Sequence, residues 1–138
     1  MTRAPGAPYL RGGACLDGPI GAASSLKMAY AGWTKASQAL LMAVRAIAVH
    51  EGVDEALLAE WARSQPDLPR RSEDAVRANA RMAWRFVGEM EEIAVTCAAA
   101  GLPAGFHEAA AEVYRRLAGW KDTLTAPSVA EVAKALAP

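Results

Sequence analysis

Residues 21–50 read GAASSLKMAYAGWTKASQALLMAVRAIAVH. The stretch contains no proline and is rich in alanine, which has the highest helix propensity of all residues. Its larger side chains recur at spacings of three and four, with one polar member in the series: Leu26, Tyr30, Trp33, Ser37, Leu40, Val44 and Ile47. The pattern predicts one long helix over residues 21–50. His50 in its last turn and Gly52 just beyond it are typical of a helix C-terminus.

The rest of the chain repeats this helical patterning between breakers. Asp54 is placed to cap a second helix that stops near residue 65. A third helix, starting at Asp67 or Ser72, is predicted to run to residue 100, and another is predicted over 106–118. Ser128 and Glu131 form a capping box that predicts a short terminal helix. No strand is predicted, so the expected class is an all-α helical bundle. The Gly- and Pro-rich residues 1–20 are predicted to be an N-terminal loop or arm, and residues 21–138 one α-helical domain.

Composition excludes several classes of function. The chain has 138 residues, 53% of them hydrophobic, with 15 Lys and Arg against 15 Asp and Glu. This length suits one domain, and the zero net charge argues against nucleic acid as a partner. No apolar run is long enough for a signal peptide or a membrane span, so we expect a cytoplasmic protein. Cys15 and Cys97 are too few and too far apart for a disulfide framework or a zinc site.

The length of the first helix points to assembly. At about 1.5 Å per residue, the predicted helix over residues 21–50 is about 45 Å long, longer than a compact domain of this size is wide. Its alanines would let helix axes approach closely. We therefore expect the helix to reach into a partner subunit, as in an interlocked homodimer.

Lys27 is the residue in the first helix that stands out chemically. Its neighbours at helical spacing are apolar or aromatic, and no acidic residue lies three or four positions away to make a surface ion pair. A lysine held in an apolar cleft can act as an acid or base near neutral pH. The alternative is that its side chain extends from a packed helix into water. Tyr30 follows one turn later, and its phenol could donate to a bound carbonyl.

The segments KMAYAGWTKASQALL, EGVDEALLAEWA, AWRFVGEMEEIA and GLPAGFHEAAAEVYRRLA carry a family resemblance. The run from Gly21 to Trp33 resembles the start of the long helix in the C-terminal domain of β-hydroxyacid dehydrogenases, the group of 6-phosphogluconate and 3-hydroxyisobutyrate dehydrogenases. Over roughly residues 18–120, the chain resembles a domain of unknown function found at the C-terminus of phosphogluconate dehydrogenase-like proteins. The resemblance implies a helical substrate and dimerisation domain in which Lys27 is the catalytic acid or base.

The chain also departs from that family. Tyr30, Ala31 and Thr34 stand where phosphogluconate dehydrogenases have histidine, asparagine and glutamate. No G-x-G-x-x-G motif follows a strand, and GGACLDGPIG lacks the spacing that cradles a pyrophosphate. We therefore expect this chain by itself to bind neither NAD nor another cofactor, and no metal.

The candidate catalytic residues are Lys27 and Tyr30, and the candidate substrate-binding residues are Ser24, Trp33 and Glu89. For each there is a structural alternative: a helix-start hydrogen bond for the serine, a core or interface anchor for the tryptophan, and a solvated acidic face for the glutamate. That acidic face, Glu89, Glu91 and Glu92, could pair with Arg81 and Arg85. His50 and His107 are expected at helix ends and make no metal motif.

Two functions remain open at this point. The first is a nucleotide-independent enzyme of the isomerase, lyase or cyclase type, in which Lys27 performs acid–base catalysis on a neutral, moderately apolar carbonyl compound. The second is the substrate-binding and dimerisation module of a split or truncated NAD(P)-dependent β-hydroxyacid dehydrogenase, with a separate NAD-binding chain as partner. A helical dimer without a ligand is a third possibility.

Overall fold

A computed structural model describes residues 20–138. Within these residues, six α-helices follow one another: α1 (Ala22–His50), α2 (Asp54–Ser64), α3 (Leu68–Asn79), α4 (Ala83–Ala99), α5 (Gly105–Arg116) and α6 (Val129–Leu136). Short 3₁₀ turns cover Ala80–Met82 and Ala118–Trp120. The described residues contain no strand, so the predicted all-α fold is confirmed. The predicted arm over residues 1–20 lies, apart from Ile20, outside the described residues.

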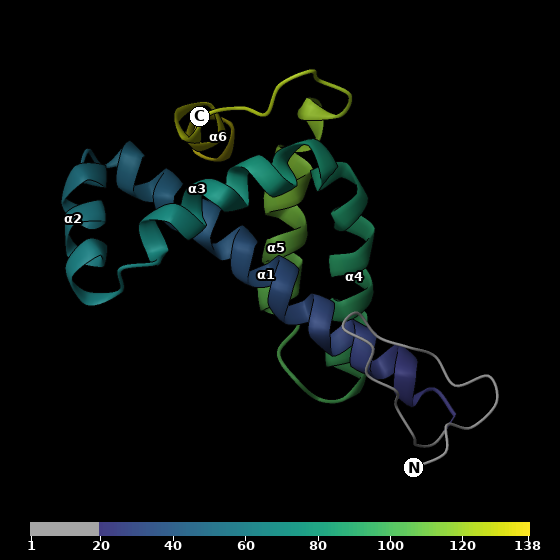
Figure 1. Ribbon diagram of the computed structural model, residues 1–138. Coiled ribbons are helices and arrows are strands. Elements are labelled where there is room, and N and C mark those ends of the chain that lie inside the picture. The colour runs from purple at the N-terminus through teal and green to yellow at the C-terminus, as the bar shows by residue number, and fades with distance from the viewer. Residues whose placement is uncertain (1–19) are drawn as a thin grey trace, which may run out of the picture.

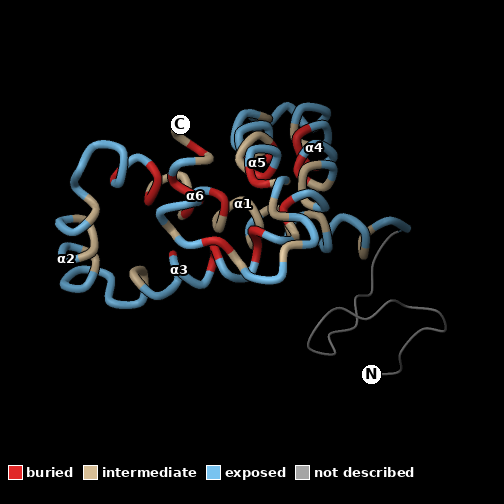
Figure 2. The backbone as a smooth tube through the Cα atoms, turned by 90° about the horizontal axis from the view of Figure 1, so that it is seen from above, coloured by how far each residue is buried: buried red, intermediate tan, exposed pale blue. Residues whose placement is uncertain are grey.

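The long helix α1 runs through the bundle and organises it (Figure 1). The helices α4 and α5 form a closely packed hairpin against α1, with α4 along its N-terminal half and α5 reaching its C-terminal half; α3 and α6 also pack on α1. The first turns of α1 extend beyond the end of this hairpin, and α2 lies at the opposite end of the molecule (Figure 1). Buried residues follow the inner sides of α1, α3, α4, α5 and α6 (Figure 2).

The core relies on small side chains with a few large ones between them. Tyr114, Met42, Met90 and Leu117 are the largest side chains that are fully buried. Alanines from several helices fill the space around them, which lets the helices approach closely.

The face of α1 that packs on the core is not the one expected. Buried positions of α1 include Ala39, Met42 and Ala46, which lie on its alanine-rich side. In the predicted apolar series, Trp33 is 72% exposed and Leu40 is 64% exposed. The spacing of this series correctly predicts a helix. It wrongly predicts the buried face, because α1 packs on the core through its alanine side chains. A row of large apolar side chains therefore faces outward.

The prediction that one helix continues to residue 100 is wrong. Helix α3 begins at Leu68, with Asp67 at its N-cap as one of the two predicted starts, and it ends at Asn79, where a 3₁₀ turn separates it from α4. The Asn79 side chain is buried and donates to the backbone oxygen of Ala75 at 2.7 Å and to the Gln38 side chain. Asparagine side chains that bond to nearby backbone compete with helical hydrogen bonding, which accounts for a break here.

The ends of the other helices are close to those predicted. Ser128 and Glu131 form the expected capping box at the start of α6. Asp54, however, is the first residue of α2 rather than its cap. Its carboxylate accepts two hydrogen bonds from the buried Arg45 guanidinium, at 2.8 and 2.9 Å, and Arg45 also donates to Ser72 at 2.8 Å. This cluster joins α1, α2 and α3.

Candidate functional site

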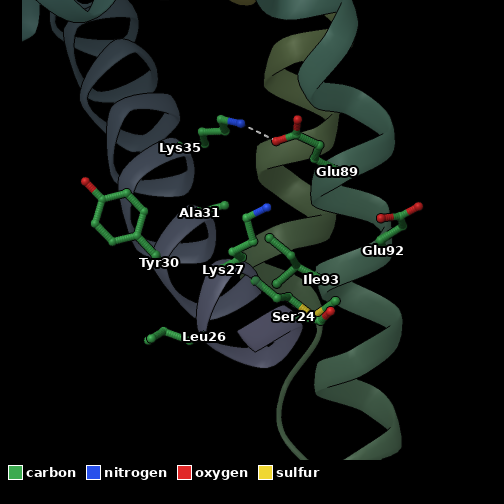
Figure 3. A pocket seen from close by; sticks show the side chains of 10 residues that line it. Ser24, Leu26, Lys27, Tyr30, Ala31, Lys35, Glu89, Glu92 and Ile93 are labelled. Atoms are coloured by element: carbon green, nitrogen blue, oxygen red, sulfur yellow. Dashed lines mark hydrogen bonds and ion pairs between the residues drawn. The ribbon is translucent and has the colours of Figure 1, made fainter. Parts of the chain in front are cut away.

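A hollow lies between the N-terminal half of α1 and the middle of α4 (Figure 3). We name it the α1–α4 cleft; its volume is about 750 Å³. It combines an apolar floor with several charged or hydroxyl groups, the mixture typical of small-molecule sites. Its lining consists of Ser24, Leu26, Lys27, Met28, Tyr30, Ala31, Lys35, Glu89, Glu92 and Ile93.

Close packing of α1 on α4 and α5 at Gly32 supports the floor of the cleft. The Nε2 atom of His107, at the start of α5, lies 3.1 Å from the backbone oxygen of Gly32. Since a carbonyl oxygen only accepts, Nε2 is the protonated nitrogen, and Nδ1 faces the Cys97 sulfur at 4.0 Å. A β-carbon on Gly32 would lie 3.3 Å from Nε2 and 3.6 Å from Ile93. Glycine therefore lets α1 sit close to α4 and α5.

An ion pair closes one end of the cleft. The Lys35 ammonium pairs with Glu89 and lies 4.4 Å from the centre of the Phe86 ring. The backbone oxygen of Lys35 accepts a hydrogen bond of 2.5 Å from the fully buried Tyr114 hydroxyl. Burial raises the pKa of Tyr114 above its usual value, and the negative charge of Glu89 raises it further. The Tyr114 phenol therefore stays protonated, and its hydrogen bond holds α5 against α1.

Lys27 points its ammonium into the space between α1 and α4 (Figure 3). It lies two turns before Lys35, and within residues 20–138 it makes no ion pair or hydrogen bond. Its side chain is exposed, because the cleft is open on one side. Lys27 is thus a cation with no ion-pair partner in the described part of the chain, beside an apolar floor formed in part by Ile93.

The structure brings together only part of the predicted site. Ser24, Lys27 and Glu89 line the cleft, with Glu89 paired to Lys35 rather than to an arginine. Tyr30 lies at the rim, where its ring extends to the side of α1 away from α4 (Figure 3). Trp33 lies outside the cleft.

Trp33 lines a separate, shallower hollow between α1 and α3. Of the predicted acidic face, Glu91 pairs with Arg115 at 2.6 Å, and Glu92 lines the cleft. The expected pairing of this face with Arg81 and Arg85 is therefore wrong for Glu89 and Glu91.

Sequence reasoning missed Lys35 and the role of His107. A spacing of eight residues places Lys35 two turns after Lys27 on a similar face of the helix, so this spacing could have identified it. The contact between His107 and Gly32 joins residues 75 positions apart and has no local signature.

Two further properties of residues 20–138 bear on the site. No three histidine, cysteine, aspartate or glutamate residues among them gather closely enough to ligate a metal ion. None of the helices they form has the length and hydrophobicity needed to span a bilayer.

The described residues form an all-helical domain with a lysine-lined cleft. The chain belongs to the family described as Domain of unknown function (DUF1932), which matches residues 48–117, half of the chain. This domain is found in the C-terminal part of 6-phosphogluconate dehydrogenase-like proteins. The match includes the α4 wall of the cleft but not Lys27. Neither the curated proteins nor the solved structures contain a match to the chain.

Proposed function

We propose that this domain binds the substrate of a β-hydroxyacid dehydrogenase-like enzyme in the α1–α4 cleft and contributes Lys27 as the acid–base group. The observation that carries the proposal is the unpaired Lys27 ammonium in a cleft of about 750 Å³. Membership of a family found beside dehydrogenase domains supports the same function.

The chemistry required of Lys27 is modest. An ammonium placed beside a substrate hydroxyl or carbonyl can stabilise an oxyanion or exchange a proton with it. The neighbouring cation, Lys35, is neutralised by Glu89, which leaves Lys27 free to meet an anionic or polarised group. The apolar surface of Met28, Ala31 and Ile93 would hold the carbon skeleton.

The open side of the cleft favours a second body. An exposed ammonium is solvated by water, which weakens its electrostatic effect on a ligand. A nucleotide-binding domain covering this side, supplied by the same polypeptide or by a separate chain, would exclude that water. This arrangement corresponds to the substrate-binding and dimerisation module.

Ligand binding to the chain itself tests the proposal. The probes are 3-hydroxyisobutyrate and 6-phosphogluconate, followed by amide chemical shifts. Lys27→Met should weaken binding about tenfold, the effect of losing one charge-assisted hydrogen bond. Lys134→Met removes an exposed lysine of α6 and should leave binding unchanged. Equal binding by wild type and Lys27→Met, or no binding of either probe, would contradict the proposal.

A second candidate function is acid–base catalysis without a nucleotide, of the isomerase, lyase or cyclase type. The observation in its favour is that Ser24, Lys27 and two carboxylates already line one cleft of this chain. The test is proton exchange at the methyl group of pyruvate in D₂O, followed by NMR. Exchange faster than in buffer, and lost in Lys27→Met, would support it. Exchange at the buffer rate would exclude this chemistry for pyruvate and leave the binding result unaffected.

We also propose that the exposed apolar face of α1 is a homodimer interface. This face comprises Tyr30, Trp33, Leu40 and Ile47, all more than half exposed. It follows a helix whose first turns extend past the bundle (Figure 1). A self-complementary helix pair would bury the row in a symmetric dimer.

Light scattering at micromolar concentration tests this interface. Wild type should have the mass of a dimer, and Trp33→Glu with Leu40→Glu should have that of a folded monomer. Leu102→Glu, a matched change at an exposed leucine after α4, should remain dimeric. A monomeric wild type would refute the interface.

A further inference from the structure

A second group of functional side chains lies away from the α1–α4 cleft, where α3, the 3₁₀ turn and the start of α4 meet the loop after Trp120. A hollow of about 360 Å³ is present there. We name it the arginine groove after Arg77, Arg81 and Arg85, which line it together with Trp84. The three arginines are spaced four residues apart, so they lie on successive turns along one side of this segment.

Two of these arginines have no counter-ion among the residues that the structure describes. Among residues 20–138, most arginines form an ion pair with aspartate or glutamate, on the surface as well as in the core. Arg77 pairs with Asp74 in this way. Arg81 and Arg85 have no carboxylate partner within the described residues; Arg81 makes one bond of 3.2 Å to the backbone oxygen of Leu124.

The surroundings of the groove keep it positive. The ammonium of Lys121 lies 4.2 Å from the centre of the Trp84 ring, which adds a fourth cation. The aspartates nearby are Asp74, already paired, and Asp122, which lines the groove. Trp84 is partly exposed and presents an indole ring beside the guanidinium groups.

We propose that the arginine groove binds a small phosphorylated ligand. The guanidinium fork matches phosphate oxygens in two-point hydrogen bonds, and Arg81 and Arg85 have N–H groups free for this purpose. The edge of the Trp84 indole gives an apolar or aromatic part of the ligand a surface to contact. The groove is independent of Lys27 and of the α1–α4 cleft.

Calorimetric titration of the purified chain tests this site with three probes: pyrophosphate, AMP and adenosine. Pyrophosphate and AMP should bind and adenosine should not, because adenosine lacks the phosphate. The indole N–H signal of Trp84, assigned with Trp84→Phe, should shift with AMP. AMP binding tighter than pyrophosphate would show that the ring of the ligand contributes; equal binding would assign the affinity to phosphate alone.

Matched variants separate a site from general electrostatics. Arg81→Gln with Arg85→Gln should weaken AMP binding about tenfold, the loss of one or two charge-assisted contacts at a solvated surface. Arg63→Gln with Arg70→Gln removes the same charge from exposed, paired arginines elsewhere. This control should change the affinity for AMP less than about twofold. Arg85→Gln alone, which breaks no ion pair or hydrogen bond formed within residues 20–138, should weaken binding without altering thermal unfolding.

Three results would overturn the proposal. If Arg63→Gln with Arg70→Gln weakens AMP binding as much as Arg81→Gln with Arg85→Gln does, the binding is due to net charge and not to the arginine groove. Adenosine binding as well as AMP would remove the role of the phosphate. A titration with pyrophosphate and AMP up to about 10 mM covers the affinities expected of a specific site. If neither probe gives a heat of binding over this range, the site is excluded.

Discussion

Replacing Arg45 with methionine should destabilise the bundle strongly, because Arg45 is only 4% exposed and joins three helices. Methionine keeps the unbranched stem but removes the guanidinium. Removing one partner of a buried ion pair costs about 3–5 kcal/mol. The Asp54 side chain is 24% exposed, so water can partly solvate the carboxylate left behind. We therefore expect a loss near the lower end, about 3 kcal/mol, and a melting temperature lower by roughly 10 °C.

Urea denaturation followed by circular dichroism measures this loss. Asp54→Ala should also be destabilising, and the double variant should lose less than the sum of the two, since the pair is coupled. Arg63→Met breaks the exposed pair with Glu60 and should cost no more than about 0.5 kcal/mol. A cost below about 1 kcal/mol for Arg45→Met, or full additivity with Asp54→Ala, would refute this account of the cluster.

Two other substitutions probe the contacts around the α1–α4 cleft. The raised pKa of Tyr114 means that the folded state retains the phenolic proton; its stabilising effect is complete below about pH 10 and is lost as pH rises further. Tyr114→Phe should therefore show a smaller loss of unfolding free energy between about pH 9 and pH 12 than wild type, measured by urea denaturation; identical pH profiles would contradict this. Gly32→Ala should destabilise the protein despite the higher helix propensity of alanine, because its methyl group meets His107. In a His107→Ala background the same change should become stabilising, by up to about 1 kcal/mol in thermal unfolding; destabilisation in both backgrounds would refute the assignment.

The sequence predicted the helices better than their packing. The positions of α1, α2 and α6 follow from local signals, such as the capping box at Ser128. The break at Asn79 depends on a side chain that bonds Gln38, 41 residues away, and local patterning does not contain that contact. The buried face of α1 was misassigned because hydrophobicity patterns weight large side chains, whereas this core is built on close alanine contacts.

The candidate site was predictable only where it lies on one helix. Ser24 and Lys27 share the first turns of α1, so their proximity follows from helical spacing. Glu89 was identified as a candidate residue, but its partner was not, because the pairing with Lys35 depends on how α1 packs on α4. Trp33 is predicted to bind substrate together with Lys27, but it lies on a different side of α1, where it lines the hollow between α1 and α3.

The two functions proposed for α1 lie on different faces of the helix. Lys27 and Lys35 turn toward α4 and line the cleft, whereas Trp33 and Leu40 face outward, away from the core. If the outward face assembles the dimer, its substitution should leave ligand contacts at Lys27 unchanged in the monomer. If binding were instead lost with the dimer, the cleft would require the partner subunit to close its open side. Measuring probe binding to the Trp33→Glu, Leu40→Glu variant distinguishes these arrangements, because both Lys27 and its apolar floor remain in the monomer.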